Sequence, residues 1–136
     1  MHCLSLQAIC HVTQLVAAND FDSLRGLLSK AELERFRSEV EREWPDRLRN
    51  TFALDPDAHV TRAAVDAVRM QKVAYLRYCD MDVRLVAAKE VVPGKRMEAV
   101  VRARFYRDYS QGKLPNWVIS RFSAEVNVKR EKSKAK

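Results

Sequence analysis

The chain has 136 residues, of which 47% are hydrophobic, with three glycines, four prolines and a formal net charge of +7. This length favours one domain with a substantial core, and the composition argues against a disordered or fibrous chain. No apolar run approaches the ~20 residues that a membrane-spanning helix needs. The opening stretch, MHCLSLQAIC, carries no pattern of a secretory signal or a mitochondrial presequence.

The first third of the chain predicts helices. Apolar residues recur at helical spacing over residues 4–16, and Asn19 is a suitable C-terminal stop. Asp20 and Asp22 are candidate N-caps of a short following segment, which Gly26 weakens or ends. Ser29 and Glu32 then have the spacing of a capping box, in which each side chain satisfies a backbone N–H of the other residue.

The capping box begins a further amphipathic helix. One stripe of this helix is apolar and holds Leu33, Phe36, Val40 and Trp44. Pro45 ends the helix, because proline has no N–H to continue the helical hydrogen bonds. We therefore expect this stripe to pack against the rest of the domain.

After residue 57 the hydrophobic period changes from the helical value toward two. Alternation over residues 97–105, 122–128 and 81–85 predicts three strands, each with one buried face. The sequence VPGK at 92–95 predicts the turn of a hairpin. Residues 65–78 change parity midway, which favours a fourth strand with a bulge, whereas a helix through residues 60–68 is the alternative.

These elements predict an α+β fold, in which N-terminal helices pack in a curved antiparallel four-stranded sheet of the cystatin-like cone type. The stretch from Asn19 to Leu24 (NDFDSL), followed by the step from Ser29 to Leu33 (SKAEL), resembles the start of the Tim-forty-four-like domain. That family belongs to the superfamily of nuclear transport factor two. The resemblance extends over about residues 4–128, so we expect one domain over residues 1–128 and a disordered basic tail over 129–136.

The resemblance implies binding without catalysis. Its relatives act in mitochondria, so we expect a protein-interaction domain at the matrix face of the inner membrane, associated with a matrix AAA protease assembly. Two alternatives stay open. The chain could belong to the mitochondrial ribosome or to the import motor, or it could be a small-molecule-binding protein or an isomerase- or dehydratase-type enzyme using the interior of the cone.

An enzyme of the last kind needs a general base facing a tyrosine or a protonated acid in a pocket. Asp66 and Tyr75 are the pocket candidates, with Tyr106 and Asp108 next to them in rank. Tyr106 shares the parity of Arg102 and therefore belongs to the wetter face of its strand. We expect the chain to have no catalytic residues.

The remaining chemistry-bearing residues predict no cofactor and no metal. Cys3, Cys10 and His11 lie near one another, but zinc sites need four ligands, and three cysteines without framework spacing indicate a reducing compartment. His59 is expected in a polar surface turn. The CDMD stretch at 79–82 predicts a solvated turn between strands, with too few acids for a calcium loop.

The net charge concentrates at the C-terminus. The last eight residues, KREKSKAK, hold five basic groups and one acid, so they supply +4 of the +7. The possible partner contacts are Trp117 and the basic residues Lys129, Arg130, Lys132, Lys134 and Lys136. We expect them to meet a protein partner, namely a membrane-associated protease, a translocase or a ribosome, or an anionic membrane surface. Because no basic stripe with interleaved aromatics is present, sequence-specific nucleic-acid binding is not expected.

Overall fold

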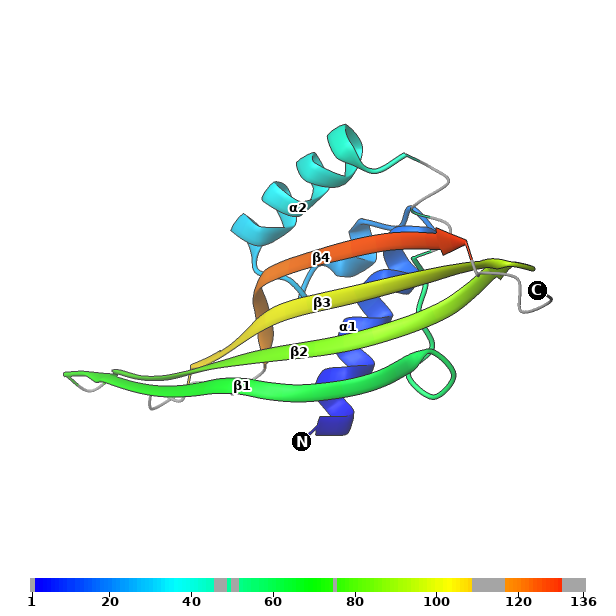
Figure 1. Ribbon diagram of the computed structural model, residues 1–136. Coiled ribbons are helices and arrows are strands. Elements are labelled where there is room, and N and C mark those ends of the chain that lie inside the picture. Colours follow the sequence, from blue (N-terminus) through cyan, green and yellow to red (C-terminus); the bar gives the residue numbers. More distant parts are fainter. Residues whose placement is uncertain (1, 46–48, 50–51, 75, 109–116, 131–136) are drawn as a thin grey trace.

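In the part of the chain that the structure describes, the fold has two α-helices, one short 3₁₀ helix and a four-stranded sheet (Figure 1). It is described from a computed structural model, which places residues 2–45, 49, 52–74, 76–108 and 117–130. The elements are α1 (His2–Ala17), η1 (Asp22–Leu24), α2 (Lys30–Glu43), β1 (Val60–Val73), β2 (Leu76–Val92), β3 (Lys95–Asp108) and β4 (Val118–Arg130).

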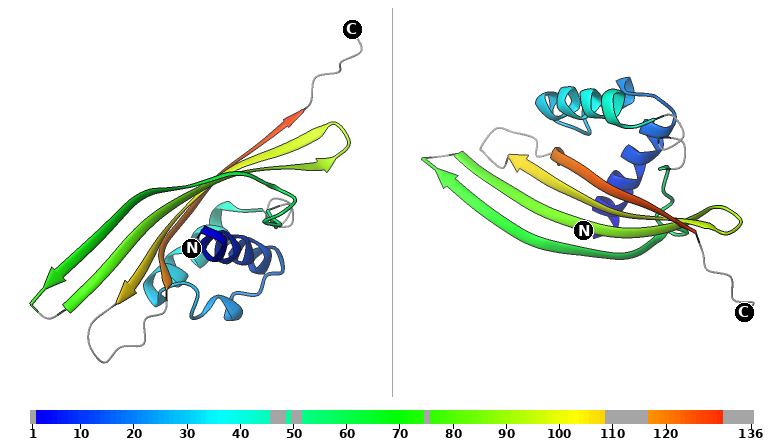
Figure 2. Two further views of the ribbon diagram at one scale, coloured as in Figure 1. Left: turned by 90° about the horizontal axis from the view of Figure 1, so that it is seen from below. Right: turned by 45° about the horizontal axis from the view of Figure 1, so that its top comes forward.

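The sheet is an antiparallel meander with strand order β1-β2-β3-β4. Both helices lie on one face of this sheet, while the other face is open, and the sheet is curved along its length (Figure 2). The predicted α+β class with a curved four-stranded sheet is thereby confirmed. The sheet does not close, so its two edges are β1 and β4.

Residues 60–73 form β1, so a strand is confirmed here and the alternative helix through residues 60–68 is wrong. Val65 lies opposite Val83, and the register shifts between Val65 and Ala67, earlier than the bulge expected midway in 65–78; from Val68 to Val73 the register is continuous. The strand nevertheless ends at Val73, and Ala74, with φ 55°, stands before the start of β2. Packing of β-branched side chains across the strand pair outweighs the helical spacing of the alanines.

The prediction that 79–82 forms a turn was wrong, because these residues continue β2. Cys79 and Met81 are 5% and 6% exposed and point toward the helices. Asp80 and Asp82 occupy the opposite face, as alternation in a strand requires. The two acids are therefore cross-strand partners of β1 and β3 residues, and the expected solvated turn does not exist.

The helix ends follow the sequence signals closely. Asn19 has φ 58°, its N–H bonds to the Val16 carbonyl at 3.0 Å, and the Asp20 N–H bonds to the Leu15 carbonyl at 2.8 Å. This pair of bonds is a Schellman ending, in which a residue in the left-handed region closes the helix. The Asp20 carboxylate then accepts bonds from the Ser23 N–H and hydroxyl, at 3.2 and 2.7 Å.

Only half of the predicted capping box forms at the start of α2. The Ser29 hydroxyl accepts the Glu32 N–H at 3.2 Å, as expected. The Ser29 N–H, however, donates to the Ile119 carbonyl of β4 at 2.9 Å and does not need the Glu32 carboxylate. That carboxylate instead accepts the Phe122 N–H at 2.8 Å. The Glu32 carboxylate therefore connects α2 to β4 and does not complete the cap. We call this contact the joint between α2 and β4.

The core lies between the helices and the sheet. Phe36 contacts Trp44 and Phe122 edge to face, with ring centroids 5.8 and 5.0 Å apart, and Trp44 contacts Phe52 at 4.8 Å. The alternating residues of β3 from Met97 to Phe105 are all buried, as predicted. Val128 was expected on the same buried face but is 55% exposed, because the end of β4 projects beyond the helices (Figure 2).

Candidate functional site

The interior of the fold, where a substrate pocket would lie, is occupied by side chains. Phe36, Phe52 and Phe122 are at most 1% exposed, and Trp44 is 8% exposed. Their edge-to-face contacts place aromatic rings through the space between α2 and the sheet. Aromatic packing of this kind stabilises the fold but presents no convergent polar groups to a ligand.

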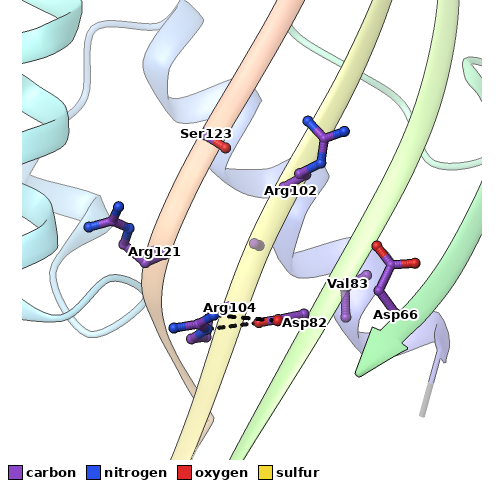
Figure 3. A pocket seen from close by; sticks show the side chains of 8 residues that line it. Asp66, Asp82, Val83, Arg102, Arg104, Arg121 and Ser123 are labelled. Atoms are coloured by element: carbon purple, nitrogen blue, oxygen red, sulfur yellow. Dashed lines mark hydrogen bonds and ion pairs between the residues drawn. The ribbon is translucent and has the colours of Figure 1, made fainter. Parts of the chain in front are cut away.

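A hollow of ≈ 380 Å³ lies instead on the open face of the sheet, and charged side chains surround it (Figure 3). Across neighbouring strands, Asp82 of β2, Arg104 of β3 and Arg121 of β4 form one row. The Asp82 carboxylate accepts the Arg104 Nε–H at 2.8 Å and an Arg69 N–H at 3.1 Å. These bonds, that from Arg104 above all, hold the pKa of Asp82 below its usual value.

Arg102 and Arg121 complete the charged surface of this hollow. Figure 3 shows both guanidinium groups directed away from the Asp82–Arg104 pair. An Arg102 Nη lies 3.2 Å from the Glu125 carboxylate and forms an ion pair with it. Arg121, in contrast, lies directly opposite Arg104, a residue of like charge. Sequence reasoning missed this cluster, although the uninterrupted period of two from Asp80 to Leu85 already placed Asp82 on the wetter face.

Of the two pocket candidates predicted from the sequence, Asp66 is described and does not lie in the interior. Asp66 sits at the bulge of β1 on the open face, where its carboxylate lies 3.5 Å from an Arg84 Nη. Tyr75 lies outside the described residues. Tyr106 lies against Tyr78, with ring centroids 5.6 Å apart, and both residues are on the open face as expected for Tyr106.

Trp117 stands immediately before β4 and is half-buried. The rings of Trp117 and Phe105 pack edge to face, with their centroids 6.5 Å apart. The Arg107 guanidinium lies 5.2 Å from the centroid of the Trp117 ring. A guanidinium at this distance from an indole makes a favourable cation–π contact. The indole thus covers one end of the core and still offers part of its surface to solvent.

Of the candidates near the N-terminus, Cys10 and His11 have different surroundings, and the side chain of Cys3 is not described. Cys10 is 1% exposed, and burial raises the pKa of its thiol to about 11, whereas the neighbouring His11 is exposed. The His59 Nδ1 accepts the Asp55 N–H at 2.8 Å, and burial, followed by nearby Lys89, lowers the pKa of this imidazole. Within the described part of the chain, no group of three or more His, Cys, Asp or Glu side chains is arranged to hold a metal ion.

The first two residues of the predicted basic tail belong to the sheet. Lys129 and Arg130 belong to β4, where they lie opposite Arg96 and Lys95 of β3. Their backbone groups pair with β3 and so continue the sheet past residue 128, which corrects the predicted boundary. Lys132, Lys134 and Lys136 lie outside the described residues. We call Lys95, Arg96, Lys129 and Arg130 the basic end of the sheet.

Among the helices that the structure describes, none is both long and apolar enough to cross a bilayer. The fold and its surface define an α+β domain with an open, curved antiparallel sheet, a filled interior and charged clusters on the outside. Searches of protein-family models, of curated proteins and of solved structures gave no match to this chain.

Proposed function

We propose that this chain is a non-catalytic interaction domain of the Tim-forty-four-like family that acts in the mitochondrial matrix. The observation that carries the proposal is the aromatic packing of Phe36, Trp44, Phe52 and Phe122 where an enzyme of this architecture would hold its substrate. The sequence steps NDFDSL and SKAEL, together with the open four-stranded sheet, support the family.

Within that family, we propose that the chain resembles the matrix AAA peptidase interacting protein. The resemblance rests on the compact domain and on the stretch RFYRDY at 104–109, of which residue 109 lies outside the described residues. The corresponding role is to bind or chaperone partners at the matrix face of the inner membrane, in an assembly with a membrane-bound AAA protease. In this role the domain binds partners through its surface, and the role requires no cofactor.

The test is affinity purification of the tagged chain from isolated mitochondria, followed by mass spectrometry. We expect protease subunits to be enriched over a control purification from the same mitochondria without the tagged chain. Enrichment of the translocase motor, or of large-subunit ribosomal proteins, would replace the protease role by one of the two family alternatives.

The enzyme alternative has its own test. Asp66→Asn and Tyr75→Phe remove the two groups with which an acid–base site would work. Because Asp66 forms only a long, half-exposed pair with Arg84, its loss should also leave the fold intact. We expect both variants to rescue cells that lack the chain as well as the wild type does. Loss of rescue with an unchanged melting temperature would favour catalysis.

A further inference from the structure

The two edges of the sheet differ in how far they are covered. The outer edge of β4 forms backbone bonds with Leu27 and Ser29 and side-chain bonds with Glu32 and Arg35. In the described part of the chain, by contrast, no element other than β2 pairs with β1, which has 14 residues. A long bare edge presents unpaired N–H and C=O groups to a further strand.

Apolar side chains flank this bare edge. Val68 is 58% exposed and Met70 is 68% exposed. They lie opposite Met81 and Cys79 of β2, on the helix-facing side of the sheet. The helices do not cover this part of the sheet, because the connected ends of β1 and β2 project past α1 (Figure 1). The edge therefore offers a partner strand both backbone groups and apolar surface, whose burial is favourable.

Regular pairing with a further strand is possible along the second half of β1. The register with β2 shifts between Val60 and Arg62 and again between Val65 and Ala67, whereas residues 67–73 pair without interruption. A bulge disturbs the ladder and bends its strand, so it opposes regular pairing on the outer side as well. A partner strand is thereby limited to residues 67–73, a length within the usual range of strands.

We propose that the partner strand is β1 of a second copy of this chain, so that two sheets join edge to edge about a two-fold axis at Met70. In this antiparallel pair Met70 lies opposite Met70 of the second copy, Val68 opposite Lys72, and Arg69 opposite Gln71. A symmetric contact of this kind uses the same surface of both copies and closes at the dimer. The proposal goes beyond the proposed function and does not rest on it.

Neighbouring registers are disfavoured by the charges and by the limits of the regular strand. An axis at Arg69 places two guanidinium groups directly opposite each other, which destabilises a sheet. An axis at Val68 brings the bulge of β1 into the pair. An axis at Gln71 places Val68 opposite Ala74, which lies beyond the end of β1 and has a φ of 55°. Met70 is therefore the centre that pairs residues 67–73 without like charges opposite each other.

Around this axis the apolar groups meet and the charges stay apart. Val68 of each copy is a diagonal neighbour of Met70 of the other, so four apolar side chains form one cluster. The two Lys72 side chains are separated by about 13 Å along the strands, at about 3.3 Å per residue. This separation exceeds the Debye length of about 8 Å at physiological ionic strength, so their repulsion is screened. Arg69 keeps its bond to Asp82, at 3.1 Å, on the open face.

The first experiment is sedimentation equilibrium of the purified full chain from micromolar to submillimolar concentrations. We expect a monomer–dimer equilibrium without larger species. Met70→Lys places two cations directly opposite each other at the axis, so it should raise the dissociation constant of the dimer at least roughly tenfold. Position 70 is exposed in the single chain, so the variant should keep its fold. Thermal melting at a concentration where the monomer dominates checks that the fold is intact.

Val128→Lys is the matched control, because it makes the same charge change at another exposed apolar position. Val128 is 55% exposed and lies on β4, at the opposite end of the sheet. We expect this variant to dimerise as the wild type does. Equal losses for Met70→Lys and Val128→Lys would mean that overall charge governs association, and the proposed surface would then be wrong. A wild-type monomer at every concentration would overturn the second copy as the partner and leave the edge to a strand of another protein.

Disulfide formation tests the register. Val68→Cys and Lys72→Cys, mixed in the presence of oxidised glutathione, should form a disulfide between copies, because opposite Cα atoms about 4.5–5.5 Å apart permit one. Neither position lies opposite a native cysteine, since Cys79 lies opposite Met70. Each variant alone should form no such link, as read by peptide mass mapping.

A dimer that gives no link in the mixture, or a link of Val68→Cys to itself, would overturn the register and with it the proposed surface. Because only the purified chain is used, these results do not depend on which assembly is recovered from mitochondria.

Discussion

The Glu32 carboxylate accepts the backbone N–H of Phe122 at 2.8 Å, although 90 positions separate the two residues. Arg35, one turn further along α2, bonds to the same carboxylate and donates to the Phe122 carbonyl at 2.8 Å. The pair thus satisfies both backbone groups of Phe122 on the outer edge of β4, as a neighbouring strand would. Leu27 and Ser29 form backbone hydrogen bonds with Ile119 on the same edge. These bonds and the Glu32–Arg35 pair together protect part of the edge of β4 from pairing with another strand.

The first prediction concerns this ion pair. Arg35→Ala leaves the Glu32 carboxylate, whose side chain is 3% exposed, without its cation, so we expect a loss of about 3–5 kcal/mol of unfolding free energy. Glu32→Gln keeps an oxygen that can accept the Phe122 N–H, so its cost should be only about 1–2 kcal/mol. Urea denaturation of both variants gives the comparison. A larger loss for Glu32→Gln would contradict the role assigned to Arg35.

The second prediction concerns the aromatic core. Phe36→Ala removes a fully buried ring that contacts Trp44 and Phe122, and it should cost about 3–5 kcal/mol. Ser38→Ala, on the exposed side of the same helix, should change stability by less than ~0.5 kcal/mol. Thermal and urea unfolding measure both changes. Similar stabilities for the two variants would refute the packing of α2 on the sheet.

The third prediction concerns pH. The pKa of Asp82 is lowered in the folded state by Arg104 and Arg69, so its stabilising effect is complete above the usual aspartate value of 3.8. The effect is lost as the pH falls through the lower, folded value. Asp82→Asn should therefore be less stable than the wild type near neutrality, by on the order of 1 kcal/mol because the carboxylate is partly exposed.

The measurement is urea unfolding of the wild type and of Asp82→Asn across the acid range. The difference between the two proteins should narrow as the pH drops below the usual aspartate value. A difference that stays constant over the whole range would mean that the Asp82 charge contributes nothing to the stability of the sheet.

The fourth prediction concerns Cys10. Because burial raises the pKa of its thiol to about 11, the reactive thiolate is scarce at mildly alkaline pH. We expect iodoacetamide to leave Cys10 unmodified in the native protein and to modify it in guanidinium chloride, as read by peptide mass mapping. His11→Cys supplies the control, since that position is exposed and its thiol should react in the native protein. Rapid native labelling of Cys10 would contradict its burial.

Sequence reasoning succeeded where a local rule fixes the outcome. The alternation over residues 97–105 predicted the buried face of β3, and Asn19 predicted the end of α1, because strand parity and left-handed helix endings depend on adjacent residues alone. The same reasoning failed where a distant element decides. Glu32 has the spacing of a capping box with Ser29, but the Ser29 N–H donates to the Ile119 carbonyl and not to the Glu32 carboxylate.

Two further errors have the same physical origin. Asp80 and Asp82 looked like a turn, since acids are rare in central strands, yet cross-strand arginines stabilise Asp82 there. Val128 continues a perfect alternation but extends past the helices that would cover it. The open-face arginine cluster and the basic end could not be predicted either, because both depend on the register between strands.

The joint between α2 and β4 also sets an order of events in protein synthesis. Each strand pairs with its neighbour in sequence, but the bonds of Glu32 and Arg35 to Phe122 must wait until the last strand has been made. On the ribosome, the apolar stripe of α2 therefore has no partner on β4 until almost the whole chain has emerged. We expect stalled nascent chains that end before Val118 to be cleaved by protease within residues 30–44 and to recruit chaperones, and chains carried past Arg130 by a linker long enough to bring β4 out of the exit tunnel to be protected.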